Sequence, residues 1–308
     1  MILIQILLLA IGFLMLVKGA DWFVDGCSGI AGKLGIPQLV VGLTIVAMGT
    51  STPEAAVSIN ASIKGNAGIA IGNIVGSNIL NILIILGISA IIATMAIQKT
   101  TFCYEIPYMI FITIVLLVLG MTGGYVTRME GVILWILFLA YLVYLFFLSK
   151  KGAEESDTEE RPVWKLMLFM ITGGVLVVWG SDVTVESATE IAHMIGLSKR
   201  FIGLTIVALG TSLPELVTSV VAAKRGNADI AIGNIVGSNI FNILFVIGTT
   251  SIIAPVIYEA DFLFDGVIAV FAGVLLWISV AKTKTLRKQW GIIMLLCYSG
   301  YLGYLLMQ

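Results

Sequence analysis

The sequence predicts an all-α integral membrane protein with ten transmembrane helices, arranged as two five-helix repeats of inverted topology. Of its 308 residues, 59% are hydrophobic and only 11% are charged, whereas roughly a quarter of the residues in soluble domains are charged. Apolar runs of about 20 residues, the length that crosses a bilayer, recur along the whole chain. The second half of the chain repeats the sequence of the first. Together these observations place most of the protein in lipid.

The apolar runs form two sets of five. In the first half they cover residues 2–20, 36–62, 69–95, 103–121 and 131–149, and in the second half 163–181, 197–222, 229–254, 262–280 and 290–307. The first run is interpreted as a membrane span and not as a signal peptide, because it has no basic leader and no clear cleavage site. It also has a counterpart in mid-chain, where no signal peptide can stand.

The repeat is visible at a constant offset of 161 residues. Residues 42–87 recur as residues 203–248, with 31 of the 46 aligned positions identical. Because each copy has an odd number of spans, the second copy enters the membrane from the opposite side, as in the inverted repeats of secondary transporters. We therefore expect a first repeat at 1–149, a polar linker at 150–162 and a second repeat at 163–308.

The charges predict the orientation and exclude several classes of protein. The linker side of the predicted spans holds thirteen Lys and Arg residues and the other side four. Cytoplasmic loops carry the excess of basic residues, so we expect a multi-pass protein of the cell membrane with a cytoplasmic linker and both termini outside. The 17 basic and 18 acidic residues give a net charge of −1, which offers no electrostatic footprint for nucleic acid. No obligate protein partner is evident.

Enzymatic and zinc chemistry are not expected. The chain has one His and three scattered Cys residues, too few for a zinc site or a Ser-His-Asp relay. It also lacks an HExxH motif and an aspartyl pair of the GxGD type. We expect no cofactor.

Two acidic residues stand out because they lie deep inside apolar runs. Glu54 and Glu215 occupy equivalent positions in the second and seventh runs. An unpaired carboxylate at membrane depth costs several kcal/mol, so it marks a functional site by default. No basic residue lies at matching depth in the sequence. A bound cation or a proton therefore supplies the missing positive charge.

The residues next to each Glu favour a metal cation. Pro53 and Pro214 precede the two acids in GTSTPE and GTSLPE, and a proline inside a helix breaks or kinks it. Broken helices at membrane depth line cavities, and their freed carbonyls are ligands for Na+ or Ca2+. Hydroxyl groups lie three and four residues before each Glu, on the same helical face. They belong to Thr50 and Ser51, and to Thr211 and Ser212.

The following span of each half carries a polar stripe. Its residues are spaced four apart and share one helical face. They are Asn73, Ser77 and Asn81 in the first half, and Asn234, Ser238 and Asn242 in the second. Glycines in the same segments, Gly76 and Gly237 among them, allow a neighbouring helix to approach closely. These oxygens complete a set that suits a hard cation with six to eight oxygen ligands.

With these motifs, the sequence resembles the calcium/cation antiporter superfamily, specifically its prokaryotic Na+/Ca2+ exchanger branch. The stretches GTSTPE…GNIVGSNILN and GTSLPE…GNIVGSNIFN look like its two α-repeats. The resemblance implies ten helices, of which the second, third, seventh and eighth surround four clustered cation sites, while the first and sixth slide across this core as the gate.

The resemblance also implies roles for individual residues. Glu54 and Glu215 match the carboxylates that hold Ca2+, helped by the backbone carbonyls of Thr50 and Thr211. The ligands of two flanking Na+ sites are matched by Ala47, Ser51 and Ser77, and by Ala208, Ser212 and Ser238. Asn81 and Asn242 match the middle position, and the Asn at 242, where some relatives have Asp, weakens the case for K+ dependence.

The function predicted from these residues is secondary active exchange of Na+, moving inward, for Ca2+, moving outward, by alternating access. Two carboxylates give the empty site a charge of about −2, which one Ca2+ neutralises and more than two Na+ overcompensate, so transport is expected to carry net charge. Ca2+/H+ or other cation/Ca2+ exchange is the alternative. The Gly that follows GNIV, where proton-coupled relatives typically carry Glu, argues against it. A cation channel is less favoured, because broken inverted repeats suit alternating access.

Overall fold

The computed structural model describes residues 2–64, 68–151, 161–195, 208–259 and 261–307. Residues 203–207 of the predicted second motif and residues 152–160 of the predicted linker lie outside these ranges. The described part of the chain is almost entirely helical, with four two-residue strands. Seven of its helices are long and apolar enough to cross a membrane, or eight if one bent pair counts as a single span.

The first half forms helices around three π-helical segments, named η. Its elements are α1 (Ile2–Leu34), α2 (Gln38–Val41), η1 (Gly42–Val46), α3 (Ala47–Thr50), α4 (Thr52–Ile63), α5 (Gly68–Leu80), η2 (Asn81–Leu86), α6 (Gly87–Ile92), β1 (Met95–Ala96), η3 (Thr101–Glu105), α7 (Ile106–Gly123), β2 (Tyr125–Val126) and α8 (Arg128–Lys151).

Where it is described, the second half repeats this order except for η3, whose counterpart residues lie within the α-helix α15. Its elements are α9 (Val163–Met194), α11 (Ala208–Thr211), α12 (Leu213–Lys224), α13 (Ala228–Phe241), η5 (Asn242–Ile247), α14 (Gly248–Ile253), β3 (Val256–Ile257), α15 (Asp261–Ala281), β4 (Thr285–Leu286) and α16 (Lys288–Met307). The last helix covers the predicted run 290–307.

Both predicted helix breaks are present. In the first half, the helical segments Gln38–Thr50 and Thr52–Ile63 meet at an angle of 50°, with Ser51 between them at φ −80° and ψ 7°. In the second half, Ser212 separates α11 from α12 at φ −93° and ψ 7°. The prolines explain the position of the breaks, because Pro53 and Pro214 stand in the first turn of α4 and α12, where a helix tolerates the missing N–H.

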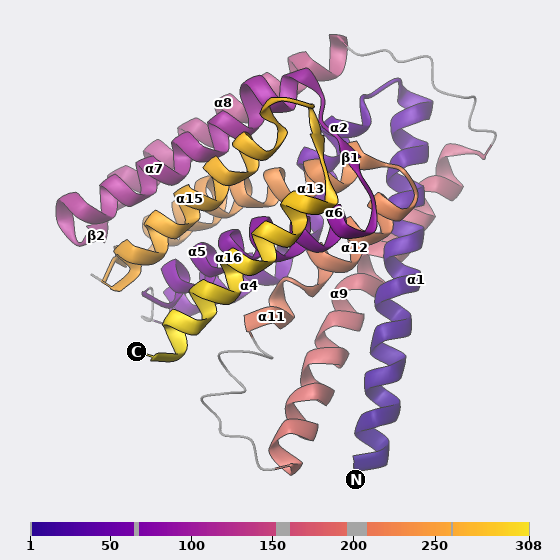
Figure 1. The fold of residues 1–308 in the computed structure, drawn as a ribbon, viewed down its shortest axis with the longest axis horizontal. Coiled ribbons are helices and arrows are strands. Elements are labelled where there is room, and N and C mark those ends of the chain that lie inside the picture. The colour runs from indigo at the N-terminus through magenta and orange to yellow at the C-terminus, as the bar shows by residue number, and fades with distance from the viewer. Residues whose placement is uncertain (1, 65–67, 152–160, 196–207, 260, 308) are drawn as a thin grey trace.

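The helices α1 and α9 form a long pair along one side of the molecule (Figure 1). Their contact is tight because glycines bring the backbones together. A Cβ atom at Gly19 would lie 2.8 Å from the backbone nitrogen of Val177, and one at Gly180 would lie 2.8 Å from that of Leu16. Only glycine fits such a contact, so α1 and α9 pack closely along their length and form one pair, the α1–α9 unit.

The centre of the molecule consists of α5 with η2 and α13 with η5, surrounded by the other helices (Figure 1). These segments are almost completely buried, including Ile74, Leu83, Ile235 and Leu244. The outer helices instead expose large apolar side chains, such as Leu3 and Phe147, as expected for surfaces that face lipid. The predicted close approach at glycine occurs at Gly237, where a Cβ would lie 2.7 Å from the carbonyl oxygen of Leu43. The same prediction is wrong for Gly76, where a Cβ would meet no described atom within 4 Å.

Short strands join the two halves. In one antiparallel pair, Met95 of β1 is opposite Leu286 of β4, and in the other, Tyr125 of β2 is opposite Ile257 of β3. Each pair connects a strand of the first half with one of the second. The ends of the neighbouring outer helices are thereby fixed against the opposite half.

Candidate functional site

Glu54 and Glu215 lie in the first turns of α4 and α12, directly after the two breaks. Both side chains are fully buried, with 0% exposure. Among the described residues neither forms an ion pair with Lys, Arg or His. The position at a helix N-terminus gives each carboxylate the favourable end of a helix dipole, which stabilises negative charge by about 0.3–1 kcal/mol. This is far less than the cost of burying the charge.

The two breaks face each other and exchange hydrogen bonds. The Ser51 hydroxyl donates to Glu215 Oε1 at 2.7 Å, and the Ser212 hydroxyl donates to Glu54 Oε1 at 3.1 Å. Each serine therefore holds the carboxylate of the other half of the chain. The structure thus brings together the four residues at one centre between the two halves, although 161 residues separate each from its counterpart.

Several oxygens at or near this centre have no hydrogen-bond partner in the described part of the chain. They are Glu54 Oε2, Glu215 Oε2, Asn81 Oδ1, Asn242 Oδ1 and Thr211 Oγ1, and all five are buried atoms. A buried oxygen left without a donor costs about 1–3 kcal/mol, and more if it is charged. Each of the two carboxylates therefore has one oxygen, Oε2, that a cation can bind.

The predicted stripes on α5 and α13 divide into two groups by their contacts. Ser77 lies 3.5 Å from the Ser212 hydroxyl, and Asn81 lies one turn further along the same face. In the other half, the Ser238 hydroxyl donates to the carbonyl of Ala47 at 3.4 Å, and Asn242 follows one turn later. These four residues reach the contact between the halves.

The amide Nδ2 groups of Asn73 and Asn234 bind the broken helices of their own halves. Asn234 Nδ2 donates to Ser219 at 2.9 Å and to the carbonyl of Glu215 at 3.4 Å. Asn73 makes the corresponding bonds to Ser58, at 2.9 Å, and to the carbonyl of Glu54, at 3.3 Å. Their amides hold the first turns of α4 and α12 in position and do not lie among the free oxygens.

Thr50 and Ala47 lie in α3, at the break. Thr50 is 1% exposed, and its hydroxyl donates to Asn234 Oδ1 at 3.0 Å. Ala47 is fully buried, and its carbonyl accepts bonds from Ser51 N at 3.0 Å and from Ser238. Their counterparts Ala208 and Thr211 stand at the two ends of α11, and the side chain of Ala208 lies outside the described residues.

Two further asparagines, Asn78 and Asn239, were not predicted from the sequence. Each donates to the backbone carbonyl of the other at 3.2 Å. Their Oδ1 atoms also accept the amides of Asn242, at 3.1 Å, and Asn81, at 2.9 Å. Because the Nδ2 groups of Asn81 and Asn242 are used in this way, their Oδ1 atoms remain available as acceptors. One sequence signal could have identified them: the Asn at position 78 recurs at position 239, at the offset of the repeat.

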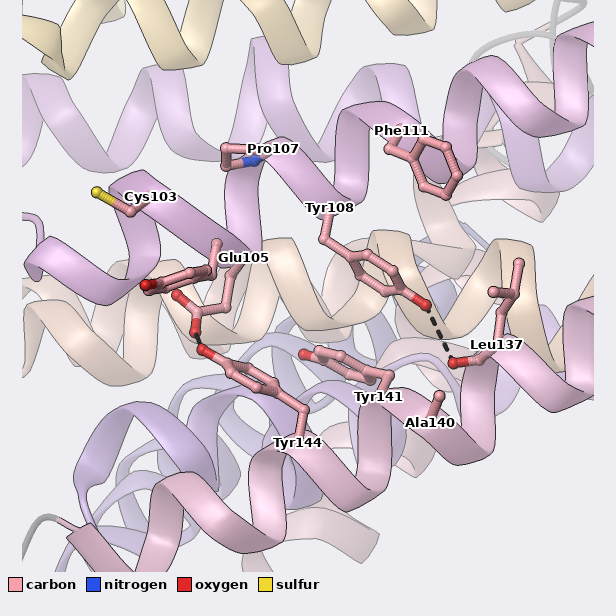
Figure 2. A pocket seen from close by; sticks show the side chains of 10 residues that line it. Cys103, Glu105, Pro107, Tyr108, Phe111, Leu137, Ala140, Tyr141 and Tyr144 are labelled. Atoms are coloured by element: carbon pink, nitrogen blue, oxygen red, sulfur yellow. Dashed lines mark hydrogen bonds between the residues drawn. The ribbon is translucent and has the colours of Figure 1, made fainter.

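Glu105 is a third buried acid, and it was not predicted from the sequence. It is 1% exposed and stands where η3 passes into α7. Figure 2 shows the Tyr144 hydroxyl of α8 donating to its carboxylate, beside a cavity of about 470 Å³ lined mainly by aromatic side chains. Asp265 on α15 likewise accepts a bond of 2.8 Å from Tyr301 on α16. These acids join neighbouring outer helices, away from the Glu54–Glu215 centre.

Three further acids lie at the ends of predicted spans. Asp21 of α1 forms an ion pair with Arg225 at 2.7 Å, and Asp229, in the first turn of α13, accepts a 2.6 Å bond from Gln98. Asp182 lines a cavity of about 510 Å³ between α9 and the two breaks, together with Thr52, Pro53, Gly210 and Thr211. The cavity therefore lies directly beside the first turn of α4 and beside α11.

Comparisons with known proteins agree with this arrangement. The family model described as sodium/calcium exchanger protein matches residues 4–147 and 165–307. The sodium/calcium exchanger MaX1 of Methanosarcina acetivorans is 31% identical, over 98% of both chains. The inner membrane protein YrbG of Escherichia coli is 33% identical, over 88% of both chains.

A solved structure has the same fold. The sodium-calcium exchanger NCX_Mj, in crystals soaked with zero Na+ and Ca2+, superimposes with a TM-score of 0.87 at 33% sequence identity, over 99% of this chain and 100% of that one. The duplicated motifs, the paired breaks and these matches lead to one conclusion. The chain is a multi-pass membrane protein that belongs to the sodium/calcium exchanger family of cation antiporters.

Proposed function

We propose that this chain exchanges Na+ for Ca2+ across the cell membrane, taking Na+ inward and Ca2+ outward by alternating access. The observation that carries the proposal is the pair of fully buried glutamates, each held by a serine of the opposite half and each with one oxygen free of partners in the described residues. Relatives named as sodium/calcium exchangers support the choice of the two ions.

The oxygen set of the centre suits these cargo ions. Glu54 and Glu215 supply the charge for Ca2+, together with the backbone carbonyls of Thr50 and Thr211. Flanking Na+ ions are held by Ser51, Ser77 and Ala47, and by Ser212, Ser238 and Ala208, while Asn81 and Asn242 line the middle. Oxygen ligands of this kind suit hard cations.

In the proposed architecture, ten spans form two inverted halves, 1–149 and 163–308. A cytoplasmic linker joins the halves, and both termini lie outside. The contacts that support it recur in pairs at an offset of 161, such as Ser51 to Glu215 and Ser212 to Glu54, or Asn73 to Ser58 and Asn234 to Ser219. Such reciprocity is expected of two halves related by a two-fold axis in the membrane plane.

Charge counting indicates that the cycle is electrogenic. Two ionised carboxylates balance one Ca2+, so an exchange in which more than two Na+ replace it moves net positive charge in the direction of Na+. Occupancy by the two kinds of ion is then mutually exclusive, because Ca2+ and the full set of Na+ together would leave a large buried positive charge.

Proteoliposomes test this function directly. Vesicles loaded with Na+ and diluted into Na+-free buffer are expected to take up radioactive Ca2+, and an interior-positive potential set with K+ and valinomycin is expected to speed the uptake. Uptake that follows a pH gradient and ignores Na+ would establish Ca2+/H+ exchange instead. A single-channel conductance in planar bilayers would contradict an exchanger altogether.

A further inference from the structure

The long helices α1 and α9 carry acidic pairs at equivalent positions. Asp21 and Asp25 lie one turn apart on α1, and Asp182 and Glu186 lie one turn apart on α9, at an offset of 161. Residues four apart share one helical face. The two pairs are therefore related in the same way as the two glutamates of the central site, but they stand on the helices outside the core.

The pair on α1 is closed by an arginine of the core. Arg225 caps the C-terminus of α12, the broken helix that begins beside Glu215. Its guanidinium donates to Asp21 Oδ1 at 2.7 and 3.1 Å and lies 3.3 Å from Asp25 Oδ1. About a third of each side chain is exposed, so the cluster lies at the edge of the molecule. It ties α1 to the far end of α12.

A second arginine connects α1 to its own partner helix. Arg161, two residues before α9, forms an ion pair with Asp25 at 2.5 Å. This bond lies within the α1–α9 unit, whose backbones are already in contact at Gly19 and Gly180. The Arg161 bond is thus internal to one rigid unit, whereas the Arg225 bonds join that unit to the core.

The pair on α9 is open. Asp182 and Glu186 line the cavity of about 510 Å³ that separates α9 from α4 and α11. A neighbouring cavity of about 520 Å³ lies between α9 and the η1–α3 segment, and Asp182 lines it as well. In the described part of the chain, neither acid has an ion-pair partner within 4 Å. The structure is therefore closed at one acidic pair and open at the other.

The counterpart of Arg225 in the first half is also basic. At an offset of 161 it is Lys64, which caps the C-terminus of α4 and is exposed. The molecule thus has two equivalent sets, each made of a basic residue at a helix C-terminus and an acidic pair. In this structure the basic residue binds the acidic pair in only one set, that of Arg225 with Asp21 and Asp25.

We propose that Arg225 and Lys64 are alternating latch residues, which hold the α1–α9 unit at one end of the core or at the other. In this conformation Arg225 binds Asp21 and Asp25. In the alternate conformation those bonds break and Lys64 binds Asp182 and Glu186, which closes the cavity beside α9. The inference rests on the proposed alternating access, and it assigns these residues a role as positioning groups that never touch the ions.

The test measures the two conformations without requiring transport. Spin labels are placed on exposed positions of α4 and α9, at Asn60 and Glu190, in a variant whose three native cysteines are replaced. Pulsed electron paramagnetic resonance then gives the ratio of short to long distances. Arg225→Gln is expected to raise this ratio about 2- to 5-fold, since it removes a partly exposed ion-pair cluster. Lys64→Gln is expected to lower the ratio by a similar factor.

Two variants control for general damage to the structure. Arg225→Lys retains the charge and is expected to stay near the wild-type ratio. Arg161→Gln breaks the bond inside the α1–α9 unit and is expected to leave the ratio unchanged. Equal effects of Arg161→Gln and Arg225→Gln, shifts of the same sign for Arg225→Gln and Lys64→Gln, or no shift in either would overturn the proposal.

The same measurement separates failure of the latch from failure of the proposed function. If wild-type protein shows one and the same distance in Na+, in Ca2+ and without ions, alternating access itself is contradicted. If the wild type shows both distances but the ratio ignores Arg225→Gln and Lys64→Gln, alternating access stands and the latch does not.

Discussion

The two central glutamates share a feature that distinguishes them from the other buried acid in a predicted span. Glu54 and Glu215 each accept one bond from a serine of the opposite half and keep one oxygen without a donor among the described residues. Glu105 also has a free buried oxygen there, but its donor, Tyr144, comes from the adjacent helix of the same half. Burial alone therefore does not distinguish the proposed ion site from Glu105, whereas the bonds between the halves do.

This difference predicts that a Glu→Gln substitution impairs transport at the two central glutamates but not at Glu105. Glu54→Gln or Glu215→Gln keeps the side-chain volume but removes one of two ligand charges, and is expected to weaken Ca2+ binding about 10- to 100-fold, because the charge of the ligands sets the affinity. The measurement is Na+-driven uptake of radioactive Ca2+ by proteoliposomes, as a function of Ca2+ concentration.

Glu105→Gln is the matched control, since it also removes a buried carboxylate from a predicted span. The amide oxygen of the substituted side chain can still accept the Tyr144 hydroxyl, so exchange is expected to stay near the wild-type rate. Near-normal Ca2+ affinity in Glu54→Gln, or a loss in Glu105→Gln as large as in Glu54→Gln, would show that the site has been assigned to the wrong acid.

At the scale of the helix, local sequence determined the breaks but not the path of the helices around them. Pro53 and Pro214 predicted where α4 and α12 begin, because a missing N–H acts on its own helix. The π-helical segments at Asn81 and Asn242 and the strand pairs between the halves were not predicted. They depend on contacts with distant residues, which no local pattern records.

The same distinction applies to the site. Spacing groups Ser77 and Ser238 on one helical face with Asn73 and Asn234, and in the structure the two serines contact the opposite half. Asn73 and Asn234 bind Ser58 and Ser219 of their own half through their Nδ2 groups, and Asn234 Oδ1 also accepts the Thr50 hydroxyl of the opposite half at 3.0 Å. Spacing along a helix determines only roughly toward which side a side chain points. Which residue it contacts on that side depends on how the helices pack.

The close contact of α13 with the first broken helix, at Gly237, predicts that a larger side chain there destabilises the protein. A Cβ atom at Gly237 would lie 2.7 Å from the Leu43 carbonyl oxygen and 2.8 Å from the Ala47 Cβ, both in the segment that precedes the first break. Gly237→Ala must therefore push α13 away from η1 and α3, at a cost of about 1–3 kcal/mol. We expect the melting temperature in detergent to fall by several degrees.

A glycine without such contacts provides the comparison. A Cβ at Gly300 on α16 would meet nothing within 4 Å among the described residues, so Gly300→Ala is expected to leave the melting temperature unchanged or slightly higher, since alanine favours the helix. Equal melting temperatures for Gly237→Ala and Gly300→Ala would mean that the contact at Gly237 is looser than the structure indicates.

Over the whole molecule, the duplication explains why one sequence predicts so much of its own site. Every residue of the first motif that reaches the centre has a counterpart 161 positions later, so a residue type required by the ions is visible twice. The asymmetry between the halves is the part that duplication cannot predict. Arg225 forms ion pairs with the acids of α1, whereas in the described part of the chain Lys64 forms none with Asp182 or Glu186 of α9.

The contacts between the halves also predict how the chain tolerates interruption. The strand pairs β1–β4 and β2–β3, the Asn78–Asn239 bonds and the serine–glutamate bonds all join residues of the first half to residues of the second. We expect separately encoded segments 1–151 and 161–308, expressed together, to assemble and to retain Na+-driven Ca2+ uptake, since Arg161 and its bond to Asp25 stay intact. Purification through a tag on one segment should recover the other.

Either segment expressed alone lacks the serine that binds its glutamate in the complete protein, and is expected to elute as an aggregate on gel filtration. Two stable, separate segments that do not bind each other would contradict a site built between the halves.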